Sequence, residues 1–460
     1  MEIGGFEVQV AKDSRFLAWV LGVDMLRSDG WPRDALGFAL NKDLKNDDSL
    51  VSWKVTKPQD NTGAKPMWSL TCLPVNVYHA LYKFKPVFRC AQGRHFWVFC
   101  WVLIALILDN GKGKLKDLCT YLPPKLRYWT LMRMVRSGQW DANMLVGEMS
   151  REVLNWLPAP ADGVLHLGAD KTRKDKRGRK HPLGLVTRDS KHSPYGFGFE
   201  MVVLIASWDG YRIPIDLKVM DPKIKGHQNI LFRQMLETVH LPSWVRHVIV
   251  SGDAGFAANP TLKLIEKKGW TYVFAMARNR KFTSGKYVSD LMRHLPKSSY
   301  RRRATYKPDG RRCDYWVFQK RATLHNLGDV TMVLSKKRRN AGPNQGRLFV
   351  TNLQDVKAST VLSLYAWRWG VEVTIKELKG GLHLGQMQVT RDADRVARSV
   401  ALSVCAYLLL VRLYGREEES GQPWSLFRLK QRFHADVMRE EVERTERKWQ
   451  RKLKQYEDAA

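Results

Sequence analysis

The order of apolar segments between residues 164 and 275 constrains the fold more than any other feature of the chain. Two β-rich runs, 199–207 and 211–219, are joined by Asp209 and Gly210, a strong signal for a β-hairpin. Further patterns surround this hairpin: a strand at 164–170, a helix at 230–239, a strand at 247–253, a helix at 260–267 and a strand at 270–275. This order predicts a mixed α/β sheet.

Two of the predicted strands end in a carboxylate, Asp170 and Asp253. Open α/β sheets usually carry their chemistry at strand ends, so we expect both side chains to take part in a functional site. The alternative is that they only cap local structure. Asp209 is accounted for by the hairpin turn, and Asp216 and Asp221 are typical of ordinary surface acids.

Changes of pattern along the chain predict six segments. They are an unassigned segment at 1–85, a helical region at 86–155, the first part of the core at 160–275, a basic strand-rich insertion at 276–355, the second part of the core at 356–415 and a charged helical tail at 416–460. The helical region is either a helix-turn-helix-like DNA reader or a subdomain with a solvated basic face. For the tail we favour a solvated helix over a helix that binds a partner.

The charge balance points to a polyanionic partner. Lys and Arg number 77 against 45 Asp and Glu, which gives a net charge of +32. We expect nucleic acid first and an acidic membrane surface second. The hydrophobic content of 44% excludes a disordered basic tail. The longest apolar run, 96–108, is shorter than the roughly 20 residues that cross a bilayer, so we predict a buried core helix.

The segment 359–379 is the most informative part of the chain, and its pattern predicts one helix. At 100° per residue, Tyr365, Arg368, Glu372 and Lys379 fall within an arc of roughly 60°. One face would then present a phenol, a guanidinium, a carboxylate and an ammonium in line. Taken alone, such a face is also compatible with a ladder of surface ion pairs.

The spacing of these four residues, Tyr365-x2-Arg368-x3-Glu372-x6-Lys379, resembles the signature of a large family of bacterial insertion-sequence transposases of the DDE class. The resemblance covers roughly residues 160–415. It implies an RNase H-like core interrupted by a strand insertion before the glutamate helix. It also implies that Asp170, Asp253 and Glu372 are the catalytic acids.

Three carboxylates suit two-metal phosphoryl transfer, because hard divalent cations prefer oxygen ligands and closely packed acids repel one another without them. We therefore expect two Mg²⁺ ions, with Mn²⁺ as a substitute, on Asp170, Asp253 and Glu372. By the same resemblance, Arg368 and Lys379 would hold phosphates beside the scissile bond, and Tyr365 would donate a hydrogen bond to the same strand.

Other basic residues are candidates for weaker contacts with the DNA backbone. Those that follow Asp170 are Lys171, Arg173, Lys174, Arg177 and Arg179. Trp316 in the insertion is either a platform for a flipped base, as in relatives that cut through a DNA hairpin, or a packing aromatic between strands.

These features predict a transposase that cleaves the ends of its element and joins the 3′-OH groups to target DNA. Its partners would be double-stranded DNA, as terminal inverted repeats and as target, and a second copy of the chain in the DNA complex. We expect no membrane association and a cytoplasmic location, at the nucleoid if the source is bacterial. The alternatives are an RNase H-like nuclease that never joins ends and a catalytically silent, transposase-derived DNA-binding protein.

Overall fold

The computed structural model describes residues 2–3, 6–7, 70, 72–89, 94–123, 125–176, 181–187, 196–387, 392–416 and 425–458. The chain divides into two compact units, Met1–Ser69 and Leu70–Ala460. In the first unit the described residues form two short paired strands, β1 (Glu2–Ile3) and β2 (Phe6–Glu7). Most of the unassigned segment 1–85 therefore lies outside the described residues. All that follows concerns the second unit.

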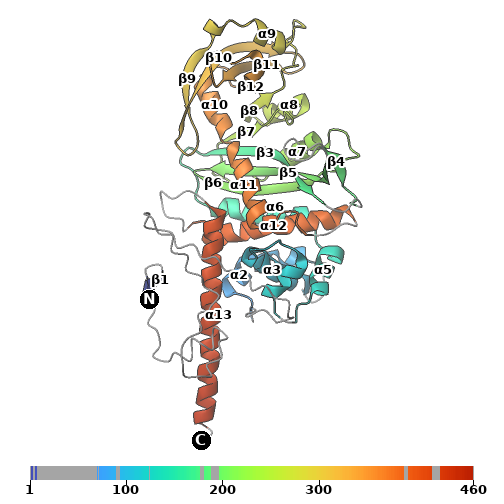
Figure 1. Cartoon of the computed structure of the whole chain (residues 1–460), viewed down its shortest axis with the longest axis vertical. Helices are drawn as coiled ribbons and strands as arrows, with labels where there is room; N and C mark the ends of the chain where they lie inside the picture. The colour runs from blue at the N-terminus through green and yellow to red at the C-terminus, as the bar shows by residue number, and fades with distance from the viewer. Residues whose placement is uncertain are drawn as a thin grey trace, which may run out of the picture. The chain divides into compact units, whose positions relative to one another are not determined.

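The centre of the second unit is a mixed sheet (Figure 1). Its core strands are β3 (Val164–Asp175), β5 (Gly196–Trp208), β6 (Tyr211–Val219), β7 (His247–Gly252) and β8 (Thr271–Met276). They lie in the order β6-β5-β3-β7-β8, in which β5 is antiparallel to both of its neighbours and β3, β7 and β8 are parallel. This is the strand order of an RNase H-like core, as the sequence predicts. A short strand, β4 (Leu185–Thr187), also pairs with β5.

The hairpin between β5 and β6 forms at the predicted turn. Asp209 and Gly210 have φ values of 40° and 83°. Such positive values at both turn residues suit a tight hairpin, since the backbone twist then matches that of the strands.

The predicted insertion is present and continues the same sheet. After helix α9 (Val288–His294), an antiparallel set follows, made of β9 (Arg301–Tyr306), β10 (Arg312–Leu324), β11 (Gly328–Lys336) and β12 (Arg347–Thr351). Strand β12 pairs antiparallel with β8, so the core and the insertion form one ten-stranded sheet.

Helices cover the core and form the region before it. The region before the sheet holds α2 (Val75–Leu81), the 3-10 turn η1 (Tyr82–Val87), α3 (Arg94–Leu108), α4 (Leu115–Leu118), η3 (Cys119–Tyr121), α5 (Tyr128–Ser137) and α6 (Ala142–Trp156). The core carries α7 (His227–Thr238), α8 (Asn259–Lys267), α10 (Ala358–Ala366), α11 (Trp369–Gly381), α12 (Ala393–Tyr414) and α13 (Leu426–Glu457). Short 3-10 turns, η4 (Lys297–Ser299) and η5 (Pro343–Gln345), lie in the insertion.

Helices α3 and α12 are core helices. As the sequence predicts for the run 96–108, every residue of α3 from Val98 to Leu108 is buried. Helix α12 contacts β6 on one side and α2, α3 and α5 on the other, so it lies between the sheet and the helical region (Figure 1). By length and composition it could span a membrane, but 78% of its apolar stretch is buried inside the fold. Its burial explains its apolar sequence.

Two local predictions are wrong. Strand β3 does not end at Asp170 but continues to Asp175, because its second half pairs with β5 up to Gly198. The single helix predicted at 359–379 is two helices, α10 and α11, separated at Trp367 and Arg368. At this break the backbone changes to tighter bonds that span three residues, with Arg368 N–H donating to Tyr365 O (3.0 Å) and Val371 N–H to Arg368 O (3.0 Å).

Candidate active site

The two aspartates meet because β3 and β7 are parallel neighbours in register. Gly168 on β3 lies opposite Ser251 on β7. Asp170 and Asp253 each come two residues later, so they stand at the same level on adjacent chain segments. Burial raises the pKa of Asp170, and the charge of Asp253 raises it further, while the Arg368 guanidinium opposes the rise.

Glycine at position 168 allows helix α11 to approach the sheet. A Cβ atom on Gly168 would lie 2.5 Å from Cγ2 of Val371, so a larger residue would push the helix away. Val371 is next to Glu372, and this close packing brings the glutamate above Asp170. The third predicted acid therefore comes from a helix that contacts the strand carrying the first.

Arg368 joins two of the three acids. Its Nη1 donates a hydrogen bond to Asp170 Oδ2 at 3.0 Å, and its Nη2 donates to Glu372 Oε1. The break between α10 and α11 places the guanidinium between the strand and the helix. Its Nε is buried and has no hydrogen-bond partner. The guanidinium is thus the counter-ion of Asp170 and Glu372, and its Nε–H group is unused.

Tyr365 and Lys379 lie on either side of this ion pair, on different helices. The Tyr365 ring packs on Phe349 of β12, with ring centroids 4.6 Å apart, and its centre is 5.7 Å from the Arg368 guanidinium. Burial raises the pKa of Tyr365, so its hydroxyl stays protonated and can donate. Lys379 Nζ donates to the backbone oxygen of Arg173 at 2.8 Å, and burial lowers its pKa.

The other residues predicted to contact the DNA backbone lie outside the group around Arg368. Lys171 pairs with Glu200 at 2.9 Å and Arg173 with Asp175 at 2.8 Å. Lys174 is half-buried, and burial lowers its pKa. Arg177 and Arg179 lie outside the described residues.

Trp316 and its neighbour Tyr315 point to opposite faces of β10, because side chains alternate along a strand. Trp316 is half-buried beside the Arg339 guanidinium, 5.3 Å from its ring centre. Tyr315 instead lines a cleft of about 1280 Å³ that also contains Tyr365, Arg368 and Glu372. The aromatic on the site's side of β10 is therefore Tyr315.

Several residues of this cleft were not predicted. The cleft is also lined by Arg212, Arg347, Trp367, Trp369 and Glu377. His166 stacks on Trp367 with ring centroids 4.4 Å apart, and the Arg212 guanidinium lies 3.3 Å from Glu377 Oε1. Strand alternation could have indicated His166, because it places this residue on the same face of β3 as Asp170.

The acids suit divalent metal ions in kind, as hard oxygen ligands on adjacent elements. Throughout the part of the chain that the structure describes, no three His, Cys, Asp or Glu side chains are arranged to hold a metal ion. Arg368 binds the carboxylates of Asp170 and Glu372 itself. The oxygen donors of the three acids fit Mg²⁺ in kind.

A comparison with known protein families matches part of the chain. Residues 199–409, which run from β5 to α12, match the family described as the transposase DDE domain. No curated protein matches the chain. Among solved structures, a piggyBac transposase synaptic complex with hairpin DNA is 12% identical, with a TM-score of 0.44 over 81% of this chain and 80% of that chain. The matched range includes Asp253 and Glu372, whereas Asp170 precedes it.

Proposed function

We propose that this chain is a DNA transposase that cleaves the ends of a bacterial insertion sequence and joins the freed 3′-OH groups to target DNA. The observation that carries the proposal is the position of Asp170 and Asp253 at one level of adjacent parallel strands, below the helix that carries Glu372. The two aspartates and the glutamate come from three distant parts of the chain, and Glu372 lines an open cleft.

Asp170, Asp253 and Glu372 would hold two Mg²⁺ ions, or Mn²⁺ in their place. When bound, such ions activate the attacking oxygen and stabilise the leaving oxygen of a phosphodiester. The protein's own part is to hold the acids on rigid elements. The raised pKa of Asp170, caused first by burial and also by the charge of Asp253, supports a site that binds positive charge.

Arg368 would change partners when DNA binds. A guanidinium can bind a phosphate through two parallel hydrogen bonds, whereas here its two Nη atoms bind two different carboxylates. A phosphate in the cleft would therefore compete for Arg368 and release Asp170 and Glu372. Tyr365 would donate a hydrogen bond from its hydroxyl to a phosphate oxygen of the same strand, and Lys379 would add a point charge.

DNA would reach this site across basic surfaces. In the helical region, α5 presents exposed Tyr128, Trp129 and Arg133, and Arg127 precedes it. This combination of cations and flat rings favours a DNA reader over a merely solvated face. We propose double-stranded terminal repeats and target DNA as partners, and a homodimer that pairs two ends at the nucleoid, in the cytoplasm.

The test is a joining assay with DNA that carries the element's terminal repeats and already ends in 3′-OH. Asp170→Asn, Asp253→Asn and Glu372→Gln should each abolish cleavage and joining while leaving DNA binding intact. Asp221→Asn, an acid outside the cleft, is the matched control and should keep wild-type rates. Full activity of any of the three acid variants would refute the proposal. If the wild-type chain cleaves DNA but does not join it, an RNase H-like nuclease is favoured. If the wild-type chain does neither, a silent DNA-binding protein is favoured.

A further inference from the structure

Among the described residues, Asp253 has no ion-pair partner, whereas Arg368 binds the other two acids. Asp253 begins a tight turn at the end of β7, in which its Oδ1 accepts a hydrogen bond from the N–H of Gly255 at 2.9 Å. A carboxylate oxygen can accept two hydrogen bonds, and the carboxylate has two such oxygens. Asp253 therefore keeps acceptors for a further donor.

Helix α7 supports this turn from the face of the sheet opposite to α11. Phe232 of α7 packs on Phe256, with ring centroids 5.1 Å apart, and its ring lies 6.3 Å from that of Phe274 on β8. The Phe274 ring covers Gly252 of β7, whereas Ser251 faces the side of α11, because successive residues of a strand point to opposite faces. The acids are thus approached by α11 from one face and by α7 from the other.

The first turn of α7 brings two amide side chains to the turn after β7. Asn229 Nδ2 donates a hydrogen bond to the backbone oxygen of Gly255 at 2.9 Å, which fixes the turn relative to the helix. A Cβ atom on Gly255 would lie 2.9 Å from Gln228 Nε2 and 3.1 Å from Asp253 Oδ1. The Gln228 amide and the Asp253 carboxylate therefore lie beside each other at this glycine.

These two groups are suited to hold one water molecule between them. Nε2 of Gln228 and Oδ1 of Asp253 are no further apart than the two distances just given, added together, and no described hydrogen bond joins them directly. A water molecule between them would accept from the amide and donate to the carboxylate. Ala254 and Gly255 are exposed, so water reaches this place from the solvent.

The two reactions of the proposed function differ in their nucleophile. In cleavage, a water oxygen forms a bond to phosphorus and the bond from phosphorus to the 3′ oxygen breaks. In joining, the freed 3′-OH attacks a phosphorus of the target strand in the same way. In each reaction the nucleophile loses a proton to the solvent and the leaving oxygen gains one. Both reactions use the same acids, but only cleavage needs a bound water.

We propose that Gln228 is a water-positioning residue, whose amide and Asp253 together hold the water that attacks the phosphodiester in cleavage. The inference rests on the proposed function, because it assigns a further residue to the same site. In-line displacement needs the attacking and leaving oxygens on opposite sides of phosphorus. Gln228 comes from α7 and Arg368 from the break before α11, so the two side chains reach the acids from different faces of the sheet.

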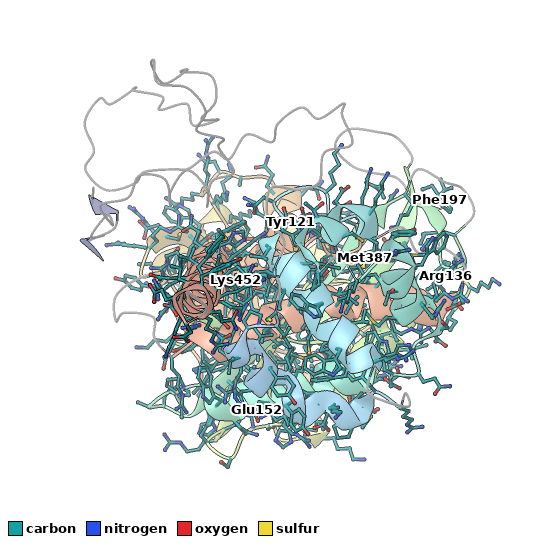
Figure 2. The ribbon with its side chains drawn as sticks, turned by 90° about the horizontal axis from the view of Figure 1, so that it is seen from below. Tyr121, Arg136, Glu152, Phe197, Met387 and Lys452 are labelled. Atoms are coloured by element: carbon teal, nitrogen blue, oxygen red, sulfur yellow. The ribbon has the colours of Figure 1, made fainter. Side chains whose placement is uncertain are left out.

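Gln228 is remote from the proposed DNA reader in the helical region. Helix α7 contacts α8 and β5, whereas α5 lies on the other side of α12 (Figure 1). Figure 2 views the unit from below, the side on which α5 and its Arg136 lie. A substitution at Gln228 should therefore leave DNA reading intact.

The experiment compares two DNA substrates that carry the terminal repeat, one intact across the element's end and one that already ends in 3′-OH. Gln228→Ala should cleave the intact DNA about 100-fold more slowly than the wild-type chain, because the water loses its donor. It should join the pre-cleaved DNA within about twofold of the wild-type rate and bind intact DNA with unchanged affinity. Gln234→Ala makes the same change at an exposed position of α7 and is the matched control, with both rates unchanged.

Asn229→Ala separates the positioning of water from the support of the turn. It removes the hydrogen bond to Gly255 and should slow cleavage and joining alike, by about tenfold, because both reactions need Asp253 in place. The inference is overturned if Gln228→Ala cleaves at the wild-type rate, loses cleavage and joining equally, or binds DNA more weakly. A selective loss of cleavage in Asn229→Ala would overturn it too, since the effect would then belong to the turn.

The same assays separate this inference from the proposed function. Joining that survives Asp253→Asn would remove the proposed chemistry. Full cleavage by Gln228→Ala, with Asp253→Asn inactive, would remove only the role of Gln228. If the wild-type chain cleaves but does not join, the function becomes that of a nuclease. Slower cleavage by Gln228→Ala with unchanged DNA affinity would then still support the bound water, and an unchanged rate would overturn it.

Discussion

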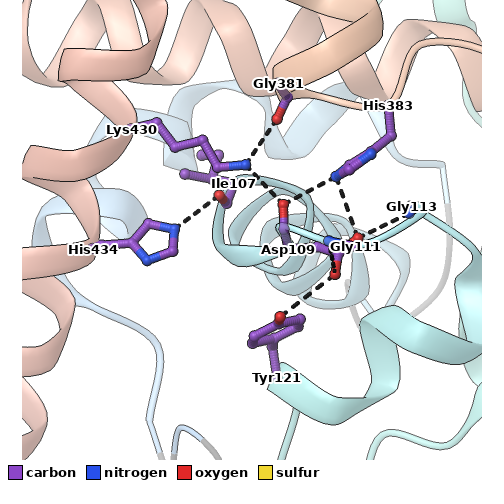
Figure 3. Close-up of polar contacts among 9 residues, drawn as sticks. All are labelled: Ile107, Asp109, Gly111, Gly113, Tyr121, Gly381, His383, Lys430 and His434. Atoms are coloured by element: carbon purple, nitrogen blue, oxygen red, sulfur yellow. Dashed lines mark hydrogen bonds and ion pairs between the residues drawn. The ribbon is translucent and has the colours of Figure 1, made fainter. Parts of the chain in front are cut away.

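The candidate active site and a second polar cluster, at the end of α3, use similar side chains in opposite ways (Figure 3). In the second cluster, the Asp109 carboxylate accepts hydrogen bonds from the backbone N–H groups of Gly111 (3.0 Å) and Gly113 (2.8 Å). Tyr121 Oη donates to the same carboxylate at 3.4 Å, and His383 Nε2 lies 3.3 Å from it. The acid is completely enclosed by partners from its own chain.

Lys430 of α13 completes this buried cluster. Its Nζ donates to the backbone oxygens of Asp109 (2.7 Å) and Gly381 (2.9 Å), the last residue of α11. His434 Nε2 lies 3.1 Å from the backbone oxygen of Ile107. Burial lowers the pKa of Lys430 to about 8. The cluster therefore ties α3, α11 and α13 together through backbone groups.

The two clusters differ in whether a polar group is left without a partner inside the protein. At the candidate active site, Arg368 keeps a buried Nε without a partner, and Glu372, one of the two acids it binds, lines an open cleft. Around Asp109, the polar groups face one another in the interior. A closed polar cluster holds elements together, whereas an open one can exchange its internal partners for a ligand.

The largest effect that tests this comparison is expected from removing the acid of the closed cluster. Asp109→Ala should lower the free energy of unfolding by about 3 kcal/mol, because it leaves the buried N–H groups of Gly111 and Gly113 without an acceptor and removes the negative charge near Lys430. Urea unfolding measures the loss. Cleavage per folded molecule should not change.

Glu372→Gln is the matching change at the candidate active site. Its free energy of unfolding should stay within about 0.5 kcal/mol of wild type, while its activity should be lost. If Asp109→Ala were as stable as wild type, or if Glu372→Gln unfolded as readily as Asp109→Ala, the distinction between the two clusters would fail.

A smaller effect concerns the histidine beside the site. Burial lowers the pKa of His166 to about 4, although Asp162 opposes this. Above pH 6.5 the ring is neutral in both folded and unfolded chains. As the pH falls from 6.5 to 5, only the unfolded chain takes up the proton, so the fold loses stability.

His166→Phe keeps a ring against Trp367 and removes the titration. It should reduce the stability lost between pH 6.5 and pH 5 by about 1.5 kcal/mol. Urea unfolding at the two pH values gives the comparison. An unchanged pH dependence would show that His166 does not titrate in the unfolded chain alone.

The smallest expected effect tests whether the candidate active site is an open cluster. Without DNA, Arg368 competes with divalent cations for Asp170 and Glu372. Arg368→Ala should therefore bind Mn²⁺ about tenfold more tightly than the wild-type chain, a change of about 1.4 kcal/mol. Electron paramagnetic resonance of free Mn²⁺ measures this without any reaction. Arg347→Ala, in the same cleft but bound to neither acid in any described contact, is the control, and weaker Mn²⁺ binding by Arg368→Ala would contradict the competition.

Local signals in the sequence predicted much of the fold. The hairpin at Asp209 and Gly210 could be predicted because its turn chemistry lies within two residues. The adjacency of Asp170 and Asp253 followed from strand patterns and a family resemblance. The full length of β3 could not be predicted, because the residues after Asp170 are polar and remain in the sheet only by pairing with β5.

Long-range contacts account for the features that were missed. The break between α10 and α11 accompanies a bond from Arg368 to Asp170, 198 positions away. The Asp109 cluster joins residues separated by 274 and 321 positions, to His383 and Lys430. No helical or strand period carries information about such partners.

The ten-stranded sheet also affects how the chain is made. Strand β8 leaves the ribosome well before β12, the strand that covers its free side. During that interval the nascent core has an unprotected edge with unpaired backbone groups, which can pair with a neighbouring nascent chain. Synthesis that pauses before residue 347 should therefore yield aggregates rather than a stable half-protein.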